Sequence, residues 1–162
     1  MNEKINREFN AQMIREFYSA YLYLSMASYF DSVNLEGFAS WMKMQAREEM
    51  YHGMKFYDFI IDRGGNIQLE DIKGEEAVWK SPVEVFEHTL SHEKKVTSFI
   101  NDLVDMAIEE SDHAANNFLQ WFVSEQVEEE STADGILQKL KLTGKDSRAL
   151  FMIDNELGRR VF

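Results

Sequence analysis

The fold is decided by residues 38–59, which read FASWMKMQAREEMYHGMKFYDF. Residues spaced three and four apart lie on one face of an α-helix. In this stretch that face has apolar residues at both ends and polar residues in the middle. The positions on this face are Phe38, Met42, Gln45, Glu49, His52, Phe56 and Phe59. Because burying unpaired polar groups is costly, a helix of this kind is expected to bind something through its polar layer.

The same periodicity predicts an all-α chain with four long helices and one short helix. Their ranges are about 5–31, 35–63, 81–110, 113–143 and 146–160. Short turns near residues 32–34 and 111–112 make consecutive helices antiparallel. Residues 65–80 lack helical periodicity, and when extended they are long enough to cross the whole bundle. The sequence therefore predicts a single domain of residues 1–162: a four-helix bundle over residues 1–144 with one long crossover, followed by a short fifth helix.

Two local signals fix the ends of the crossover. Gly64 and Gly65 follow the second helix, where glycine supplies the left-handed conformation of a helix end. Ser81, Pro82 and Glu84 have the order of an N-cap, a proline in the first turn and a capping-box glutamate. The third helix is therefore expected to begin directly after Ser81.

Composition narrows the function classes. The 162 residues include no cysteine, which excludes disulfides, Cys-bound zinc, iron-sulfur clusters and thiol nucleophiles. The formal net charge of -12 disfavours nucleic acid as a partner and favours cations. The N-terminal residues lack the apolar run of a signal peptide, and no stretch has the length of a membrane span. We expect a cytoplasmic protein without a membrane partner.

An internal repeat locates the polar layer more closely. Shifting Glu16, Glu49 and His52 by 77 positions gives Glu93, Gln126 and Glu129. Glu16 and Glu49 are 33 residues apart on one pair of antiparallel helices, and Glu93 and Gln126 are 33 residues apart on the other. These groups should therefore lie at similar heights along the bundle. On the third helix the predicted core face is Phe86, Leu90, Glu93, Thr97 and Ile100.

Four buried glutamates could not all be ionised without compensating charge. Two divalent cations would neutralise Glu16, Glu49, Glu93 and Glu129. Carboxylate oxygens with a single imidazole, from His52, suit iron or manganese better than structural zinc. Open coordination positions would admit dioxygen, so oxidation of ferrous iron is the predicted chemistry.

With these residues in view, the sequence resembles the ferritins, specifically the haem-free bacterial and archaeal type. The likeness covers essentially the whole chain. It is carried by Glu16, by residues 47–52 (REEMYH), by Glu93, and by residues 117–130 (NFLQWFVSEQVEEE), of which the last stretch is the most specific.

The resemblance implies a ferroxidase that oxidises Fe(II) with dioxygen or hydrogen peroxide and stores ferric oxide in a shell of twenty-four identical subunits. It makes Glu16, Glu49 and His52 the ligands of one iron. Glu49 would also bridge to a second iron, which Glu93 and Glu129 approach. Gln126 would lie beside this second iron. It also implies a third, weaker iron position. The residues of that position are Glu48, Glu125, Glu128 and Glu129. Tyr23 and Trp121 match aromatics near the family's centre, and either supply electrons or pack.

One departure from the general di-iron pattern is informative. That pattern has Glu-x-x-His on two helices, whereas the second copy here is Gln126-x-x-Glu129. The difference disfavours haem-binding relatives, so no haem is expected. It also predicts unequal irons, the one beside Gln126 being held less tightly.

Three other functions stay open from the residues. They are a storage shell without its own catalytic step, a metal-free signalling bundle, and another enzyme on the same scaffold such as a manganese catalase or an oxygenase. The polar layer argues against the metal-free bundle, and the full ligand set argues against the passive shell. Turnover of peroxide or of an organic substrate would identify the third.

Several polar residues are interpreted as solvated surface. A second Glu-x-x-His, Glu110 to His113, falls at a predicted helix end, and His88 with His92 lies off the third helix's core face. Glu130 is expected to be surface charge. The acidic side chains of the turn at residues 109–112 suggest a cation entrance there.

Overall fold

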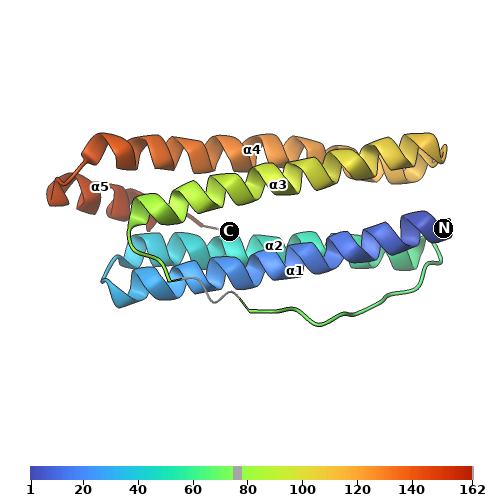
Figure 1. Cartoon of the computed structure of the whole chain (residues 1–162), viewed down its shortest axis with the longest axis horizontal. Coiled ribbons are helices and arrows are strands. Elements are labelled where there is room, and N and C mark those ends of the chain that lie inside the picture. Colours follow the sequence, from blue (N-terminus) through green and yellow to red (C-terminus); the bar gives the residue numbers. More distant parts are fainter. Residues whose placement is uncertain (75–77, 162) are drawn as a thin grey trace. The chain divides into compact units, whose positions relative to one another are not determined.

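The computed structural model describes residues 1–74 and 78–161, and within them the chain forms five α-helices and no strand (Figure 1). The helices are α1 (Glu3–Ser32), α2 (Glu36–Asp62), α3 (Pro82–Glu109), α4 (His113–Thr143) and α5 (Ser147–Leu157). The predicted all-α class and the order of the helices are confirmed. No helix among these residues combines the length and the apolarity needed to cross a membrane.

Local chemistry accounts for most of the helix ends. The Ser81 side chain accepts a hydrogen bond from the Glu84 backbone N–H, with Pro82 in the first turn, as the capping pattern predicts. Asp146 caps α5 in the same way, accepting from the N–H groups of Arg148 and Ala149. Gly64 leaves α2 with φ +66°, the left-handed conformation expected of a glycine after a helix.

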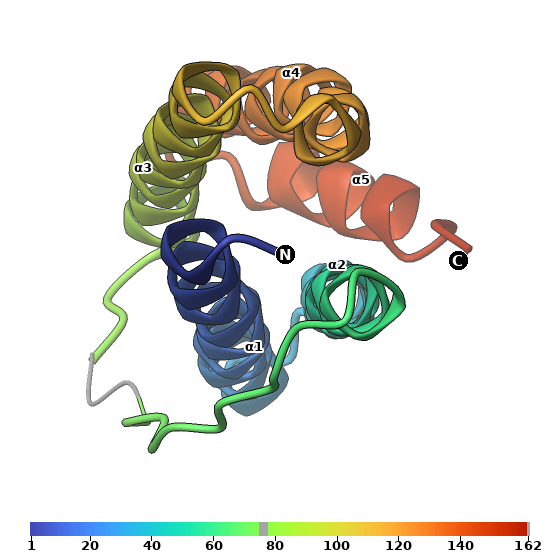
Figure 2. The same ribbon diagram turned by 90° about the vertical axis from the view of Figure 1, so that its right-hand side faces the viewer.

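The chain divides into two compact units, Met1–Lys80 with Thr143–Phe162, and Ser81–Leu142. In the first unit α1 and α2 run antiparallel side by side (Figures 1 and 2). Aromatic rings join the two helices near both ends: Phe9 meets Phe56 edge to face at 5.4 Å, and Phe30 stacks on Phe38 at 4.9 Å. These contacts enclose the middle turns, where the polar layer lies.

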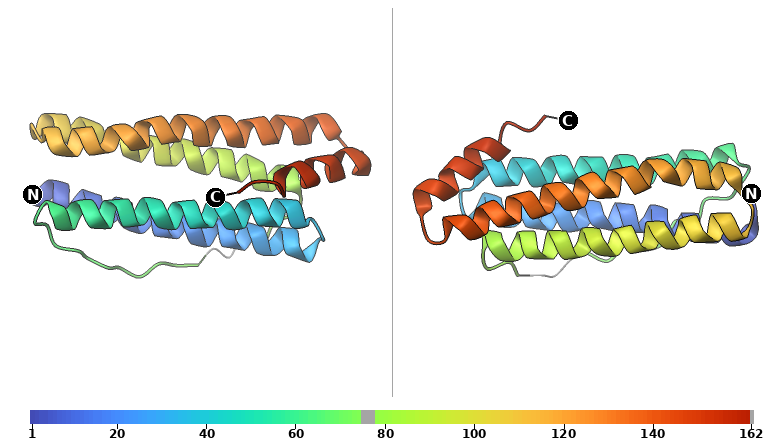
Figure 3. Two further views of the ribbon diagram at one scale, coloured as in Figure 1. Left: turned by 180° about the vertical axis from the view of Figure 1, so that it is seen from behind. Right: turned by 90° about the horizontal axis from the view of Figure 1, so that it is seen from above.

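After α2, residues 66–74 are extended and run back alongside the α1–α2 pair (Figures 1 and 3). Its start is held by two asparagines of α1. Asn6 Oδ1 accepts from the Asn66 backbone N–H, and Asn10 both donates to the Asn66 carbonyl and accepts from the Gln68 N–H. The predicted non-helical crossover is confirmed over residues 66–74 and 78–80, and residues 75–77 of it lie outside the described chain.

Helix α5 packs against the start of α2 (Figure 2). The Asp154 side chain accepts a hydrogen bond of 2.9 Å from the Phe38 backbone N–H, at the free N–H end of α2. Gly37 lies directly under the Asp154 backbone, so close that a Cβ there would be 1.7 Å from the Asp154 carbonyl oxygen. The expected end of this helix near Arg160 is wrong by three residues, because the chain turns at Gly158 and the tail leaves α5.

The second unit consists of α3 and α4, which form an antiparallel pair (Figure 3). The core face of α3 differs from the predicted one at two positions, because Leu90 and Thr97 are only half-buried. Thr89, which was not predicted, is buried. Thr89 tolerates burial because its hydroxyl donates to the Val85 carbonyl at 2.9 Å. The remaining predicted positions Phe86, Glu93 and Ile100 are buried.

Candidate metal centre

Three side chains of the first unit come together in the middle of the α1–α2 pair. Glu16 comes from α1, and Glu49 and His52 come from one turn of α2. A ligand atom of each lies within 4.8 Å of the other two, and His52 Nδ1 is 3.5 Å from Glu49 Oε2. All three residues are at most 3% exposed. Two carboxylates and an imidazole at this separation fit a divalent cation of the iron or manganese type.

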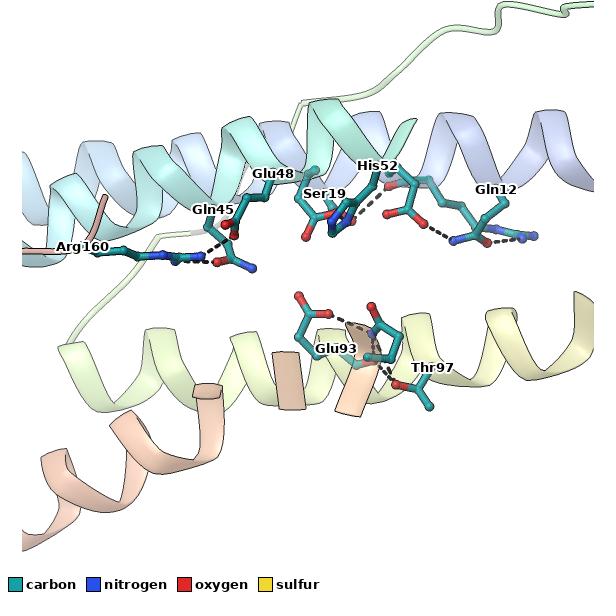
Figure 4. A network of polar contacts seen from close by, with 12 residues as sticks. Gln12, Ser19, Gln45, Glu48, His52, Glu93, Thr97 and Arg160 are labelled. Carbon is teal, nitrogen blue, oxygen red and sulfur yellow. Dashed lines mark hydrogen bonds and ion pairs between the residues drawn. The ribbon is translucent and has the colours of Figure 1, made fainter. Parts of the chain in front are cut away.

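A line of polar contacts supports Glu16 from the same helix (Figure 4). Gln12 Nε2 donates to Glu16 Oε1 at 2.7 Å, and Arg15 donates to Gln12 Oε1 at 3.1 Å. Gln12 lies one turn before Glu16 and is fully buried. Such a partner fixes the orientation of the carboxylate. Sequence reasoning missed Gln12, although its i, i+4 spacing from Glu16 was a usable signal.

Burial keeps His52 in its neutral form. Desolvation, with a smaller contribution from the charge of Lys55, lowers the pKa of His52 from 6.5 to about 4. A neutral imidazole has a lone pair to give to a metal ion, so binding at neutral pH need not release a proton from this residue.

The lowered pKa of His52 predicts how the metal-free protein responds to acid. The unfolded chain binds a proton near pH 6.5 whereas the folded chain resists it down to about pH 4, so stability falls as the pH drops through this window. The loss attributable to His52 should reach about 2 kcal/mol at pH 5. Urea denaturation of the wild type and of His52→Gln at pH 7 and pH 5 measures it. Equal losses in both proteins would contradict the prediction, since the neighbouring Glu16, Glu49 and Lys55 are common to both.

The second unit places Glu93 and Gln126 in direct contact. Gln126 Nε2 lies 3.1 Å from Glu93 Oε2, 3.2 Å from the Glu93 carbonyl oxygen and 3.3 Å from Thr97 Oγ1. These acceptors all surround the amide nitrogen, which fixes the orientation of the amide group. Gln126 is thus a hydrogen-bonding partner of a buried carboxylate.

Thr97 extends this network in a way that the sequence did not indicate (Figure 4). Its hydroxyl donates to Glu130 Oε1 at 2.6 Å. Glu130, expected to be surface charge, is in fact half-buried and bonded. A cavity of about 370 Å³ adjoins these groups on α3 and α4. Its lining residues are Thr97, Ile100, Asn101, Val123, Gln126, Val127 and Glu130.

The other candidate residues differ in exposure. Glu129 is 8% exposed, Tyr23 is fully buried, and Trp121 is 37% exposed. Of the residues assigned to a third metal position, Glu125 is half-buried and Glu128 is exposed. The remaining member, Glu48, is half-buried on α2 and pairs with Arg160, a residue to which sequence reasoning gave no role.

The histidines interpreted as surface residues differ in exposure. His88 and His113 are exposed and His92 is half-buried, while Glu110 is exposed. Within the described chain, the cluster of three or more His, Asp or Glu ligands with metal-binding geometry is the one formed by Glu16, Glu49 and His52.

Comparison with known proteins identifies relatives that match nearly the whole chain. A family model described as a ferritin-like domain matches residues 6–143. A bacterial non-heme ferritin of Bacteroides fragilis is 44% identical over 160 residues, which cover 99% of both chains. A probable bacterial non-heme ferritin-like protein of Haemophilus influenzae is 42% identical, covering 98% of this chain and 96% of that protein.

Solved structures extend the likeness to three dimensions. An open-pore ferritin from the archaeon Archaeoglobus fulgidus is 50% identical, with a TM-score of 0.98 and 99% of both chains covered. A humanized archaeal ferritin is 53% identical, with a TM-score of 0.99, covering all of this chain and 98% of the other. The fold class is thus a four-helix bundle with a short C-terminal helix. The chain belongs to the ferritin-like domain family.

Proposed function

We propose that this chain is an iron-storage subunit with ferroxidase activity, which oxidises Fe(II) with dioxygen at a di-iron centre and deposits ferric oxide mineral inside an oligomeric shell. The observation that carries the proposal is the buried cluster of Glu16, Glu49 and His52. Buried carboxylates are costly unless a cation compensates them. Family membership supports iron as that cation and storage as the purpose.

The proposed centre binds two irons. Glu16, Glu49 and His52 would hold the first, and Glu93 and Glu129, together with Glu49, would hold the second. One support is the repeat in the sequence, since the positions of the first iron's ligands are occupied 77 residues later by Glu93, Gln126 and Glu129. The other is that every proposed ligand is buried. Gln126 orients Glu93 through its amide nitrogen. No residue of this set suggests haem.

The chemistry needs two electrons for each dioxygen. Each Fe(II) gives up one electron, and dioxygen with two protons becomes hydrogen peroxide, which can itself act as a further oxidant. Carboxylates favour this reaction because their negative charge stabilises Fe(III) more than Fe(II). Hydrolysis of Fe(III) by water then gives the oxide and releases protons. Tyr23 is fully buried two turns from Glu16 on α1, and because the two Fe(II) ions supply both electrons, this reaction requires none from it.

Product iron leaves through a third, weaker position in this proposal. Its ligands are Glu48, Glu125, Glu128 and Glu129. The partial exposure of Glu125 and Glu128 is consistent with transient binding, because exposed carboxylates hold cations weakly.

The proposal also covers how the subunits assemble and where the protein is located in the cell. Residues 1–162 form one domain, and twenty-four copies form the shell around the mineral, in the cytoplasm. The net charge of -12 attracts cations toward such a shell and disfavours nucleic acid. Neither nucleic acid nor a membrane is a partner.

The test is to load the metal-free protein with Fe(II) in air, follow its oxidation, and measure the size of the iron-containing product. We expect oxidation well above the rate in buffer, with iron and protein eluting together as a large particle. A monomer-sized protein that neither accelerates oxidation nor retains iron would overturn the proposal.

A further inference from the structure

The last residues of the chain return to α2 after α5 ends. Gly158 and the residues after it turn away from α5, and Arg160 reaches back to the middle of α2 (Figure 4). Three residues of α2, spaced three and four apart, contact its guanidinium: Trp41, Gln45 and Glu48.

These contacts hold the guanidinium at three points. One terminal nitrogen donates to Gln45 Oε1 at 2.7 Å, and the other forms an ion pair with Glu48 Oε2. The guanidinium carbon lies 4.6 Å from the centre of the Trp41 ring, which is 4% exposed. The arginine and glutamate side chains are 23% and 25% exposed, so this pair is better shielded than an ordinary surface salt bridge.

The docking of α5 fixes where this guanidinium lies. Asp154 binds the Phe38 N–H, and Gly37 allows the α5 backbone to approach α2. Arg160 follows the last residue of α5, Leu157, by only three positions. The position of the Arg160 guanidinium is therefore set by the packing of α5 against α2.

We propose that Arg160 is a positioning residue that holds the Glu48 carboxylate and lowers its affinity for cations. A cation that binds Glu48 must displace the guanidinium or share the carboxylate with it, and both are opposed by the positive charge. The inference deepens the proposed function, because Glu48 belongs to the third iron position. Arg160 keeps that position weak, so iron passes through it and does not remain.

Zinc titration of the metal-free protein tests this without any redox step. Isothermal calorimetry with Zn(II) is compared for the wild type, Arg160→Gln and Arg159→Gln. Arg159 is exposed and adjacent, so its substitution removes the same charge without touching Glu48. We expect Arg160→Gln to tighten the weakest class of sites about tenfold, the size of one charged hydrogen bond, and Arg159→Gln to leave it unchanged.

Two further variants assign the effect to the pair. In a Glu48→Gln background, Arg160→Gln should no longer change Zn(II) affinity, because the carboxylate that pairs with the arginine is absent. Arg160→Lys loses the two-pronged contact to Gln45 and Glu48. It keeps a positive charge beside the Glu48 carboxylate, and because the proposed effect is electrostatic, the weak sites should stay within about twofold of the wild type. Because the lysine variant retains the cation, it tests the proposal even if Arg160→Gln loosens α5.

Three results would overturn the inference: equal tightening by Arg159→Gln, tightening that persists without Glu48, or Arg160→Lys behaving like Arg160→Gln. Failure of the proposed function would appear elsewhere, as wild-type protein that does not accelerate Fe(II) oxidation. The zinc measurement is independent of that outcome.

Discussion

Replacing Glu49 with glutamine should slow aerobic Fe(II) oxidation by at least about tenfold. Changes to groups that only support a metal ligand already cost tenfold to a hundredfold, and Glu49 is proposed to contact both irons. The amide has nearly the same volume, so the α1–α2 pair keeps its packing. It also replaces a buried ionisable group with a neutral one, so the stability of the metal-free variant should be no lower than that of the wild type.

The measurement is the initial rate of oxidation after mixing Fe(II) with excess metal-free protein. Asp58→Asn is the matched control, because it makes the same change from carboxylate to amide at an exposed position of α2. Its rate should equal that of the wild type. A Glu49→Gln protein that oxidises iron as fast as Asp58→Asn would show that the cluster of Glu16, Glu49 and His52 is not the reaction site.

Replacing Gly37 with alanine should detach α5 from α2. The added Cβ would lie 1.7 Å from the Asp154 carbonyl oxygen and 2.6 Å from its carbon. Both atoms belong to the backbone, so no side-chain rotation relieves the clash, and α5 has to move. The shift would lose the Phe38 to Asp154 hydrogen bond and expose Ile153 and Leu157, which are each 7% exposed in the docked helix.

Amide hydrogen exchange reports this detachment locally. We expect exchange in α5 to accelerate at least about tenfold, which corresponds to the 1–3 kcal/mol typical of overpacking. Gly135→Ala is the control, because nothing lies within 4 Å of a Cβ at that exposed helical position. It should stabilise α4 by up to about 1 kcal/mol. If the α5 amides of Gly37→Ala exchange at the wild-type rate, the Asp154 backbone does not lie as close to Gly37 as described.

Features set by neighbouring residues could be predicted from the sequence. The capping group at Ser81 and the glycine that ends α2 act within four residues, so their patterns can be read directly. The joint burial of Glu16, Glu49 and His52 was also predictable, because an apolar face at helical spacing surrounds each of them.

Features that depend on distant chain segments were not predictable. The pairing of Arg160 with Glu48 spans 112 residues and requires α5 to be docked first. Glu130 belongs to a run of three glutamates that suggests a solvated surface, and only the position of Thr97 on the neighbouring helix gives it a partner. Thr89 is buried in the core of α3 in place of Leu90 because its hydroxyl donates to a backbone carbonyl. The spacing of apolar residues gives no sign of such a hydrogen bond.

The asparagine contacts at the start of the crossover have a use in protein engineering. Asn6 and Asn10 fix the path of the chain only as far as Gln68. Leu69 is already 73% exposed, and a Cβ at Gly74 would meet nothing within 4 Å. Lengthening a surface connection costs little free energy. Foreign peptide sequences are therefore best inserted between residues 70 and 74, where the anchored register of the preceding residues would be left intact.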